Sequence, residues 1–247
     1  MEAFNSEPTD DPILITVVGR LVGQKNLGLV THIIARTLDY APGVKFIVLA
    51  SAPEGDADGK QTEHDFRWFA TNFPDRVYFN SGFNLPLSKL IFAGGDFTLI
   101  PSHFEPCGLV DYEASLLGTV VIGRLTGGLA KVRHCAYLYE WLDIGDRVGE
   151  ANAFFEQIKQ AIDTYRYNPT HHHYLMMTAM GLDASWEQSA AQYIAMYRYG
   201  IQLAKWYKKR WNFLADAVRE IHEDDPAAFL TLFQPRDNFD LVLKDAL

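Results

Sequence analysis

A glycine and two cations follow the first apolar segment of the chain. Gly19 comes directly after the apolar run 13–18, and Arg20 and Lys25 follow it closely. A glycine permits a tight exit from a strand, and two full positive charges beside a helix N-terminus suit a phosphate or diphosphate. Neither the dinucleotide pattern G-x-G-x-x-G nor a P-loop occurs here. From spacing alone, a phosphate site and a pair of surface cations at a turn are equally good interpretations.

A second group of chemically capable residues lies between a later apolar run and a helical pattern. Glu105 precedes Cys107, Gly108 and Leu109. Gly108 and Leu109 would present backbone amides at a helix start, and Glu113 would follow about two turns along that helix. Carboxylates accept hydrogen bonds from sugar hydroxyls in defined directions. A helix N-terminal acid followed by a solvated helix acid is the alternative, which spacing alone favours. No histidine at a motif-defined position would activate the Cys107 thiol as a nucleophile.

A third group consists of Thr126, Gly127 and Gly128, again directly after an apolar run. Paired glycines allow a backbone to approach a ligand closely, although most such pairs are simple turns. All three groups therefore lie where a predicted strand ends.

The elements that must position these groups alternate along the chain. Short apolar, β-branched runs predict buried strands, and apolar residues at helical spacing predict helices between them. The alternation predicts an α/β fold with a doubly wound, Rossmann-like parallel sheet, which binds ligands at the carboxyl ends of its strands. The predicted strands are 13–18, 44–49, 77–79, 97–100 and 120–122, and the predicted helices are 27–40, 62–73, 87–93 and 109–117.

The remainder of the chain is predicted to be helical, over 151–167, 185–206 and 211–222. Histidines 171–173 follow a proline and are interpreted as a polar loop, because three adjacent histidines do not form a tetrahedral metal site. Aromatic residues at near-helical spacing favour packing against a core or another domain over a ligand platform. These aromatic residues are Tyr193, Tyr197, Trp206 and Trp211.

Composition excludes several classes of protein. The chain has 247 residues, 48% of them hydrophobic, and a formal net charge of −9. Disorder and non-specific nucleic-acid binding are therefore not expected, and no apolar run reaches the ~20 residues of a membrane helix. Two cysteines form neither a disulfide framework nor a four-thiolate zinc site. We expect a soluble protein of a reducing compartment that binds neither nucleic acid nor a membrane.

Taken together, the three groups resemble the C-terminal half of bacterial glycogen synthases and plant starch synthases. The resemblance rests on Gly-Arg-Leu…Gln-Lys ending at Lys25, on Pro-Ser-x-Phe-Glu-Pro-Cys-Gly-Leu ending at Leu109, and on Thr-Gly-Gly-Leu ending at Leu129. Their order and spacing agree with those of the family over about residues 12–200. The resemblance implies one Rossmann-like half of a GT-B fold.

The resemblance also implies an activity. These enzymes are retaining glucosyltransferases that move glucose from ADP-glucose or UDP-glucose to the 4-hydroxyl of an α-1,4-glucan. Two cations stabilise the departing diphosphate, so no metal and no other cofactor are expected. The family's location implies the cytoplasm, or the plastid stroma in a plant.

Site residues are carried over position by position. Arg20 and Lys25 match the diphosphate-binding cations, and Glu105 matches the glutamate that contacts the donor sugar; these three are the expected catalytic residues. Gly108 and Leu109 would hold the distal phosphate through their amides, and Glu113 would bind the ribose. The remaining expected substrate-binding residues are Gly19, Phe83, Cys107, Thr126, Gly127 and Gly128. Phe83 would stack on the base, and a core phenylalanine is the equally good alternative.

Two departures from the family pattern lie close to this site. Lys131 stands where the family commonly has Asp, and Val110 with Asp111 replaces the usual Thr-Gln. The Lys-x-Gly-Gly-Leu loop of the family's N-terminal domain, which also carries the acceptor surface, does not occur in the 247 residues. We therefore expect this chain to hold half of an active site, with the glucan acceptor bound through the other half. The alternative is a non-catalytic glycosyltransferase-like binding or scaffolding module that packs on a partner chain.

Three segments are expected along the chain. Residues 1–11 are predicted to be a disordered lead-in. Residues 12–200 are predicted to form the nucleotide-sugar-binding domain with its closing helices. Residues 201–247 are predicted to be a helical C-terminal extension.

Overall fold

The computed structural model describes residues 12–143 and 145–224. The predicted lead-in 1–11, and the part of the predicted extension after residue 224, lie outside the described residues. The chain divides into two compact units, Met1–Asp183 and Ala184–Leu247, and each is considered by itself. Among the described helices, none combines the length and apolar character needed to cross a membrane.

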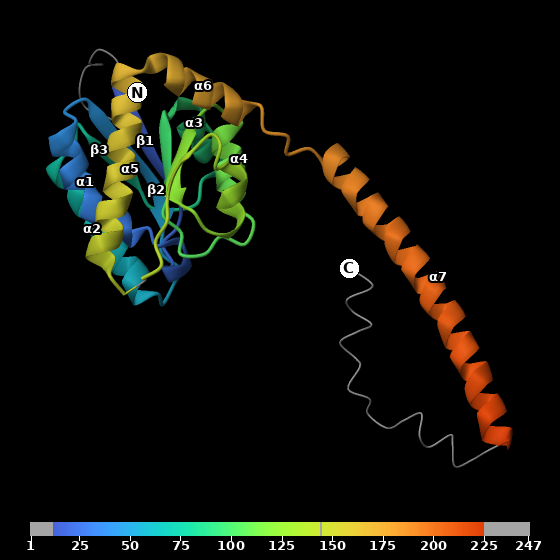
Figure 1. Ribbon diagram of the computed structural model, residues 1–247. Helices are drawn as coiled ribbons and strands as arrows, with labels where there is room; N and C mark the ends of the chain where they lie inside the picture. The colour runs from blue at the N-terminus through green and yellow to red at the C-terminus, as the bar shows by residue number, and fades with distance from the viewer. Residues whose placement is uncertain (1–11, 144, 225–247) are drawn as a thin grey trace. The chain divides into compact units, whose positions relative to one another are not determined.

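The described part of the first unit contains one parallel sheet of six strands (Figure 1). Its order is β3-β2-β1-β4-β5-β6, so the order reverses between β1 and β4. The loops after two such strands diverge and leave a crevice at the carboxyl edge of the sheet. The predicted Rossmann-like fold is therefore confirmed. The strands are β1 (Ile13–Arg20), β2 (Val44–Ser51), β3 (Val77–Asn80), β4 (Phe97–Ile100), β5 (Val120–Arg124) and β6 (Tyr137–Tyr139).

Helices cover both faces of this sheet. In Figure 1, α1, α2 and α5 lie over one face, and α3 and α4 lie over the other. The helices are α1 (Gly28–Tyr40), α2 (Ala57–Asn72), α3 (Leu85–Gly94), α4 (Val110–Ser115), α5 (Arg147–Tyr167) and α6 (Pro169–Met180). Two short 3-10 helices, η1 (Gly23–Lys25) and η2 (Gly127–Val132), follow β1 and β5.

The core explains why the strands read as continuous apolar runs. Ile15 and Val17 of β1 are fully buried, as are Ile33 of α1 and Phe154 of α5. A smaller buried group on the other face contains Val121. Burial on both faces removes the polar alternation that a half-exposed strand would show. The sheet is thus a rigid support for the loops at its carboxyl edge.

Side-chain caps decide where several helices begin. Asp56 Oδ1 accepts a hydrogen bond from the Gly59 amide at 2.8 Å, and α2 therefore begins at Ala57, ahead of the predicted start at residue 62. Asn84 caps α3 in the same way, through the Leu87 amide at 2.9 Å. Such caps satisfy amides that a helix leaves without partners in its first turn.

The prediction of a polar loop at histidines 171–173 is wrong. These residues lie in α6, which begins with Pro169 and is capped by Asn168, whose side chain accepts from the His171 amide. His172 is only 6% exposed and packs against the rings of Phe97 and Tyr165. The short strand β6 was also not predicted, because three residues give no usable periodicity.

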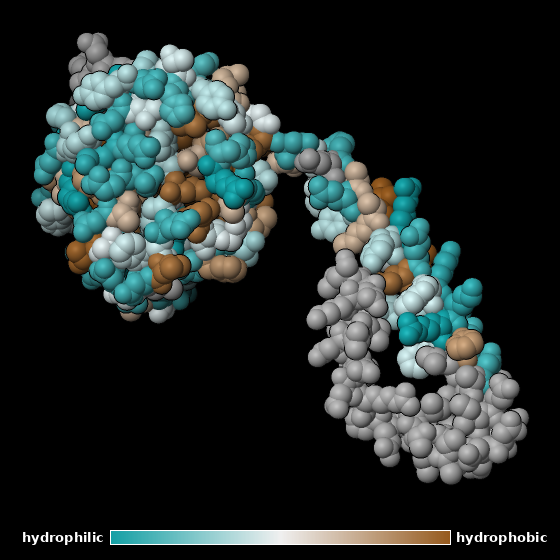
Figure 2. All heavy atoms as spheres, viewed as in Figure 1, coloured by the Kyte–Doolittle hydropathy of each residue, from teal (hydrophilic) through white to brown (hydrophobic). Residues whose placement is uncertain are grey.

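The described part of the second unit is one helix, α7 (Trp186–Asp224). Two helices were predicted over this part, with the end of the domain at residue 200. The structure shows a continuous helix through that position, and the division between units lies at Asp183 and Ala184. Both apolar and polar side chains reach the surface of α7 (Figure 2). The helically spaced aromatic residues are exposed and so do not belong to a core: Tyr193, Tyr197, Trp206 and Trp211.

Candidate donor-binding site

A cavity of about 760 Å³ opens at the carboxyl ends of β1 and β4. It lies where the strand order reverses, which is the usual ligand position in a doubly wound sheet. Its walls come from the end of β1, from η1, from the segment before α3 and from the loop that leads into α4. Most of the predicted site residues line it: Gly19, Arg20, Lys25, Phe83, Glu105, Cys107, Gly108, Leu109 and Glu113.

An ion pair lies in this cavity. Lys25 Nζ is 2.5 Å from Glu105 Oε2, which also accepts a hydrogen bond from Ser102 Oγ at 3.2 Å. The Glu105 side chain is 7% exposed and that of Lys25 is 21% exposed. A partly desolvated pair of this kind interacts more strongly than one on the surface. The two groups predicted to touch the diphosphate and the sugar are therefore already in contact.

Hydrogen bonds between the two loops bring these two residues together. The His103 amide donates to the Gln24 carbonyl at 2.9 Å, and Gln24 Nε2 donates to the Phe104 carbonyl at 2.8 Å. Asn26 closes η1 in the left-handed conformation, with φ of 50°, and its amide donates to the Gly23 carbonyl. The loop after β1 is thus fastened to the loop after β4.

The Thr-Gly-Gly segment lies behind the Glu105 loop and is not among the described residues that line the cavity. The Gly128 amide donates to the Glu105 carbonyl at 2.6 Å. A Cβ atom on Gly128 would lie 1.9 Å from the Cys107 oxygen, and one on Gly127 would lie 2.2 Å from the Glu105 oxygen. Both glycines are therefore required by close backbone contact, and Thr126 adds a hydrogen bond to the His103 carbonyl at 3.2 Å. This segment supports the loop that carries Glu105.

Three further predicted residues occupy the rim of the cavity. Arg20 is exposed at the end of β1 and makes no ion pair with another described residue. Phe83 is 88% exposed, so the alternative of a core phenylalanine is excluded. Glu113 is exposed on α4. The Arg20 guanidinium, the Phe83 ring and the Glu113 carboxylate are therefore all accessible to a ligand in the cavity.

The two departures from the family pattern are in direct contact. Lys131 Nζ lies 2.7 Å from Asp111 Oδ2, and it donates to the Gly108 carbonyl at 2.8 Å and to the Cys107 carbonyl. Asp111 is fully buried, and burial raises the pKa of its carboxyl group, whereas Lys131 acts in the opposite direction. Sequence spacing gave no sign of this contact.

Side chains from β5, β6, α5 and the loop after β4 form a second ionic cluster. Glu150 Oε1 accepts from Arg124 Nη1 and from the Tyr139 hydroxyl, each at 3.3 Å. Arg124 Nη1 also lies 2.9 Å from His103 Nδ1, which must accept because a guanidinium only donates. Burial lowers the pKa of His103, with Glu150 opposing and Arg124 reinforcing that shift. His103 is thus held neutral by its surroundings.

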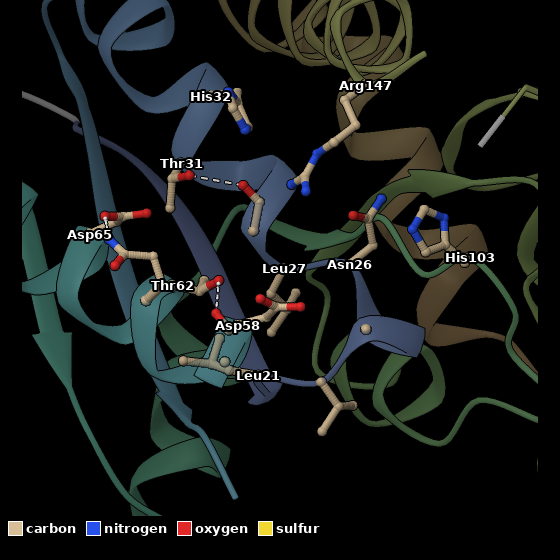
Figure 3. A pocket seen from close by; sticks show the side chains of 15 residues that line it. Leu21, Asn26, Leu27, Thr31, His32, Asp58, Thr62, Asp65, His103 and Arg147 are labelled. Carbon is tan, nitrogen blue, oxygen red and sulfur yellow. Dashed lines mark hydrogen bonds between the residues drawn. The ribbon is translucent and has the colours of Figure 1, made fainter. Parts of the chain in front are cut away.

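A smaller cleft of about 350 Å³ adjoins this cluster, and Gly23, Asn26 and His103 are among the residues that line it. Figure 3 shows His32 and Arg147 directed toward it from α1 and α5, with Asn26 and His103 beside them. Across the cleft, Thr62 donates a hydrogen bond to the Asp58 carbonyl. Among the described residues, no three histidine, cysteine or acidic side chains gather as a metal site would require.

Comparison with known proteins begins with a negative result, because no family model matches the chain. Glycogen synthase of Kosmotoga olearia is 32% identical over 194 residues, which cover 78% of this chain and 39% of that protein. Glycogen synthase of Exiguobacterium sibiricum is 36% identical over 190 residues, covering 76% of this chain and 38% of that protein. The chain thus spans about two fifths of the length of the curated relatives it matches.

A solved structure agrees with these relatives. The catalytic domain of starch synthase IV from Arabidopsis thaliana, bound to ADP and acarbose, superimposes with a TM-score of 0.68 at 27% identity. The match covers 81% of this chain and 41% of that one. The sheet order and the position of the cavity define a Rossmann-like domain of the glycosyltransferase type. More narrowly, the chain is similar to glycogen and starch synthases over about four fifths of its own length, as the sequence motifs predicted.

Proposed function

We propose that the cavity binds ADP-glucose or UDP-glucose and that the chain supplies the donor-binding half of a retaining glucosyltransferase that extends an α-1,4-glucan. One observation carries the proposal: Arg20, Lys25 and Glu105 line the same cavity as the turn at Gly108 and Leu109. Cations suit a diphosphate, a buried carboxylate suits sugar hydroxyls, and free amides suit a terminal phosphate.

Charge development explains why cations belong here. When the bond between the glucose and the diphosphate breaks, negative charge accumulates on the departing phosphate oxygens. Arg20 has no ion-pair partner among the described residues, and Lys25 has Nζ protons beyond the one that faces Glu105. Preorganised donors of this kind stabilise developing charge without rearranging solvent. On this proposal no metal ion is needed.

The acceptor glucan would be bound by a second half, since glycosyl transfer needs donor and acceptor held together with water excluded. This part of the proposal is supported by the relatives, of which the chain matches about two fifths. For the protein's location we propose the cytoplasm or, in a plant, the plastid stroma.

Calorimetric titration of the full chain with ADP, UDP and ADP-glucose tests the proposal. Binding in the millimolar range or tighter is expected, with the same affinity in EDTA as without it. The absence of both heat and a thermal shift at millimolar ligand would overturn the site. A tenfold loss of affinity in EDTA would overturn the metal-independent account and leave the site itself standing.

The two cysteines provide an independent readout of where the ligand binds. Cys107 is exposed and lines the cavity, whereas Cys135 is 1% exposed. A thiol reagent should label Cys107 selectively, and ADP should slow that labelling. Binding without protection of Cys107 would place the nucleotide elsewhere, and a Cys107→Ser variant shows how much labelling belongs to Cys135.

A further inference from the structure

Lys131 lies behind the loop of residues 105–109, in η2, and does not line the donor cavity among the described residues. Its Nζ is surrounded by three oxygens: Asp111 Oδ2, the Gly108 carbonyl and the Cys107 carbonyl. The Tyr112 ring lies on another side, with its centroid 4.4 Å away. The two carbonyls accept hydrogen bonds from the ammonium group, and the Asp111 carboxylate forms an ion pair with it. These contacts of the Lys131 ammonium group are therefore made with the loop and with Asp111, outside the cavity.

The two carbonyls held by Lys131 belong to the peptide groups that contain the Gly108 and Leu109 amides. A peptide group is planar and trans, so its N–H points away from its carbonyl oxygen. Holding both oxygens on the Lys131 side directs both N–H groups away from Lys131. Neither N–H donates a hydrogen bond to another described residue, and both residues line the cavity.

The ion pair packs tightly against this turn. Gly108 has φ of +76°, and a Cβ atom there would lie 2.5 Å from Asp111 Oδ1 and 3.1 Å from Lys131 Nζ. Asp111 itself is fully buried. A buried carboxylate behind a phosphate site would repel the ligand, and the cation beside it removes that charge. The turn, the cation and the carboxylate thus form one unit.

We propose that Lys131 is a positioning residue for the donor site. By holding the Cys107 and Gly108 oxygens, it aims the Gly108 and Leu109 amides at the terminal phosphate of a bound nucleoside diphosphate, and Asp111 keeps it in place. The inference rests on the proposed donor site and adds the way in which that site distinguishes a diphosphate from a monophosphate.

The test compares two variants of the full chain, Asp111→Asn and the double variant Asp111→Asn/Lys131→Met. Replacing Lys131 alone would leave a buried carboxylate uncompensated, so the double variant removes both charges and keeps similar side-chain volumes. Calorimetry with ADP and AMP is the measurement, because AMP lacks the terminal phosphate. The double variant should bind ADP about tenfold more weakly than Asp111→Asn, as for a lost set of oriented amide hydrogen bonds, with AMP affinity changed less than threefold. Equal losses for ADP and AMP, or no loss, would overturn the proposal.

A matched control removes an ion pair that is far from the cavity. Glu156 and Lys159 form an exposed pair on α5 with a separation of 3.0 Å. The double variant Glu156→Gln/Lys159→Met should bind ADP and AMP like the unsubstituted chain. If ADP fails to bind the unsubstituted chain, the proposed function itself is wrong, and that failure is distinct from unchanged binding by the Lys131 variant.

A second measurement needs no substitution. In nitrogen-15 NMR spectra of the chain, ADP should shift the amide signals of Gly108 and Leu109 strongly, and AMP should shift them weakly. Thermal melting establishes whether the double variant is folded. If it is not, the NMR titration decides: unshifted Gly108 and Leu109 signals at saturating ADP would overturn the proposal.

Discussion

Two lysine–carboxylate pairs lie on opposite sides of one loop and differ in what their lysines can still do. Lys25 and Glu105 meet at 2.5 Å in the cavity, and Lys131 and Asp111 meet at 2.7 Å behind the loop. The lysine side chains are almost equally exposed, at 21% and 22%. The Glu105 carboxylate is the only hydrogen-bond acceptor of the Lys25 ammonium group among the described residues, whereas the Lys131 ammonium group donates to two loop carbonyls beside its ion pair. The same kind of ion pair is therefore open to a ligand at Lys25 and holds the loop in its conformation at Lys131.

The largest contrast should appear in glucosyl transfer once the chain is combined with a glycogen synthase N-terminal half, fused or in trans. Glu105→Gln removes a group that would contact the donor sugar, and it should lower kcat by at least about 100-fold. Asp111→Asn/Lys131→Met should instead raise the donor KM by about tenfold, with a much smaller effect on kcat. Incorporation of labelled glucose from ADP-glucose into glycogen measures both.

The uncombined chain provides the baseline for that assay. Without the half that would bind the acceptor glucan, donor and acceptor are not positioned together, which amounts to roughly 7–11 kcal/mol of lost barrier lowering. Transfer by the chain alone should then fall by at least ~10⁵-fold. Robust incorporation by the chain alone would contradict the two-half account, and binding without transfer in the combined protein would favour a non-catalytic module.

The next contrast concerns the free energy of unfolding. Lys131→Met leaves the fully buried Asp111 without its cation and should cost about 3–5 kcal/mol at pH 8. Lys25→Met should cost less, because Glu105 keeps the Ser102 hydrogen bond and borders the open cavity. Urea unfolding of both variants measures the difference, and equal losses would show that the two pairs are alike.

Asp111 also sets the pH dependence of that loss. Burial raises the pKa of Asp111 above its unfolded value, so the folded state binds a proton more readily than the unfolded chain. In Lys131→Met, stability should therefore recover as the pH is lowered toward 5 and decline as it rises. A loss that is independent of pH would exclude an uncompensated carboxylate as its cause.

Arg20 can be compared with the two paired lysines, because it is a cation that lines the cavity and has no ion-pair partner among the described residues. Arg20→Ala should weaken ADP binding by about 1.5–3 kcal/mol, as for a lost charge-assisted hydrogen bond. The melting temperature should not change, because the side chain is exposed. Arg166→Ala, at the exposed end of α5, is the matched control for calorimetry. Unchanged ADP affinity in Arg20→Ala would remove Arg20 from the site.

The smallest effect is expected at His172, a buried titratable side chain with no hydrogen-bond partner among the described residues. Burial lowers the pKa of His172, as do His173 and His171. The unfolded chain therefore binds a proton more readily, so stability should be full above the unfolded pKa of about 6.5 and should decline below it, by ~1.4 kcal/mol per unit of pKa difference. His172→Leu should abolish this decline in urea unfolding between pH 7.5 and pH 5, and His171→Leu should preserve it. A decline that persists in His172→Leu would assign it to another group.

The sequence was sufficient for five of the six strands of the sheet and for most of the cavity lining. Continuous apolar runs identified five strands, and the carboxyl ends of β1 and β4 bring Arg20 and Glu105 together in any doubly wound sheet. It was not sufficient for α6, where three adjacent histidines include one buried side chain. It was also not sufficient for α7, where two helices were predicted although residues 207–210 between them contain no glycine or proline.

The contacts between individual side chains could not be predicted from the pattern of residues along the sequence. Whether Lys131 meets Asp111 depends on the left-handed turn at Gly108 and on the path of η2 beneath it. In the same way, the prediction that Gly127 and Gly128 approach a ligand did not include their close contact with the loop that carries Glu105. The two glycines correctly indicated a close backbone approach, but the sequence did not show which segment they would approach.

The hydrogen bonds that fasten η1 to the loop after β4 have a consequence for how the protein folds. Gln24 and His103 are about 80 residues apart in sequence, and their hydrogen bond joins the loops that follow the paired strands β1 and β4. Closing so long a loop is entropically costly, so we expect this hydrogen bond to form late in folding. A nucleotide that touches both sides would recognise only chains that have completed this step, and it would slow the first stage of their unfolding.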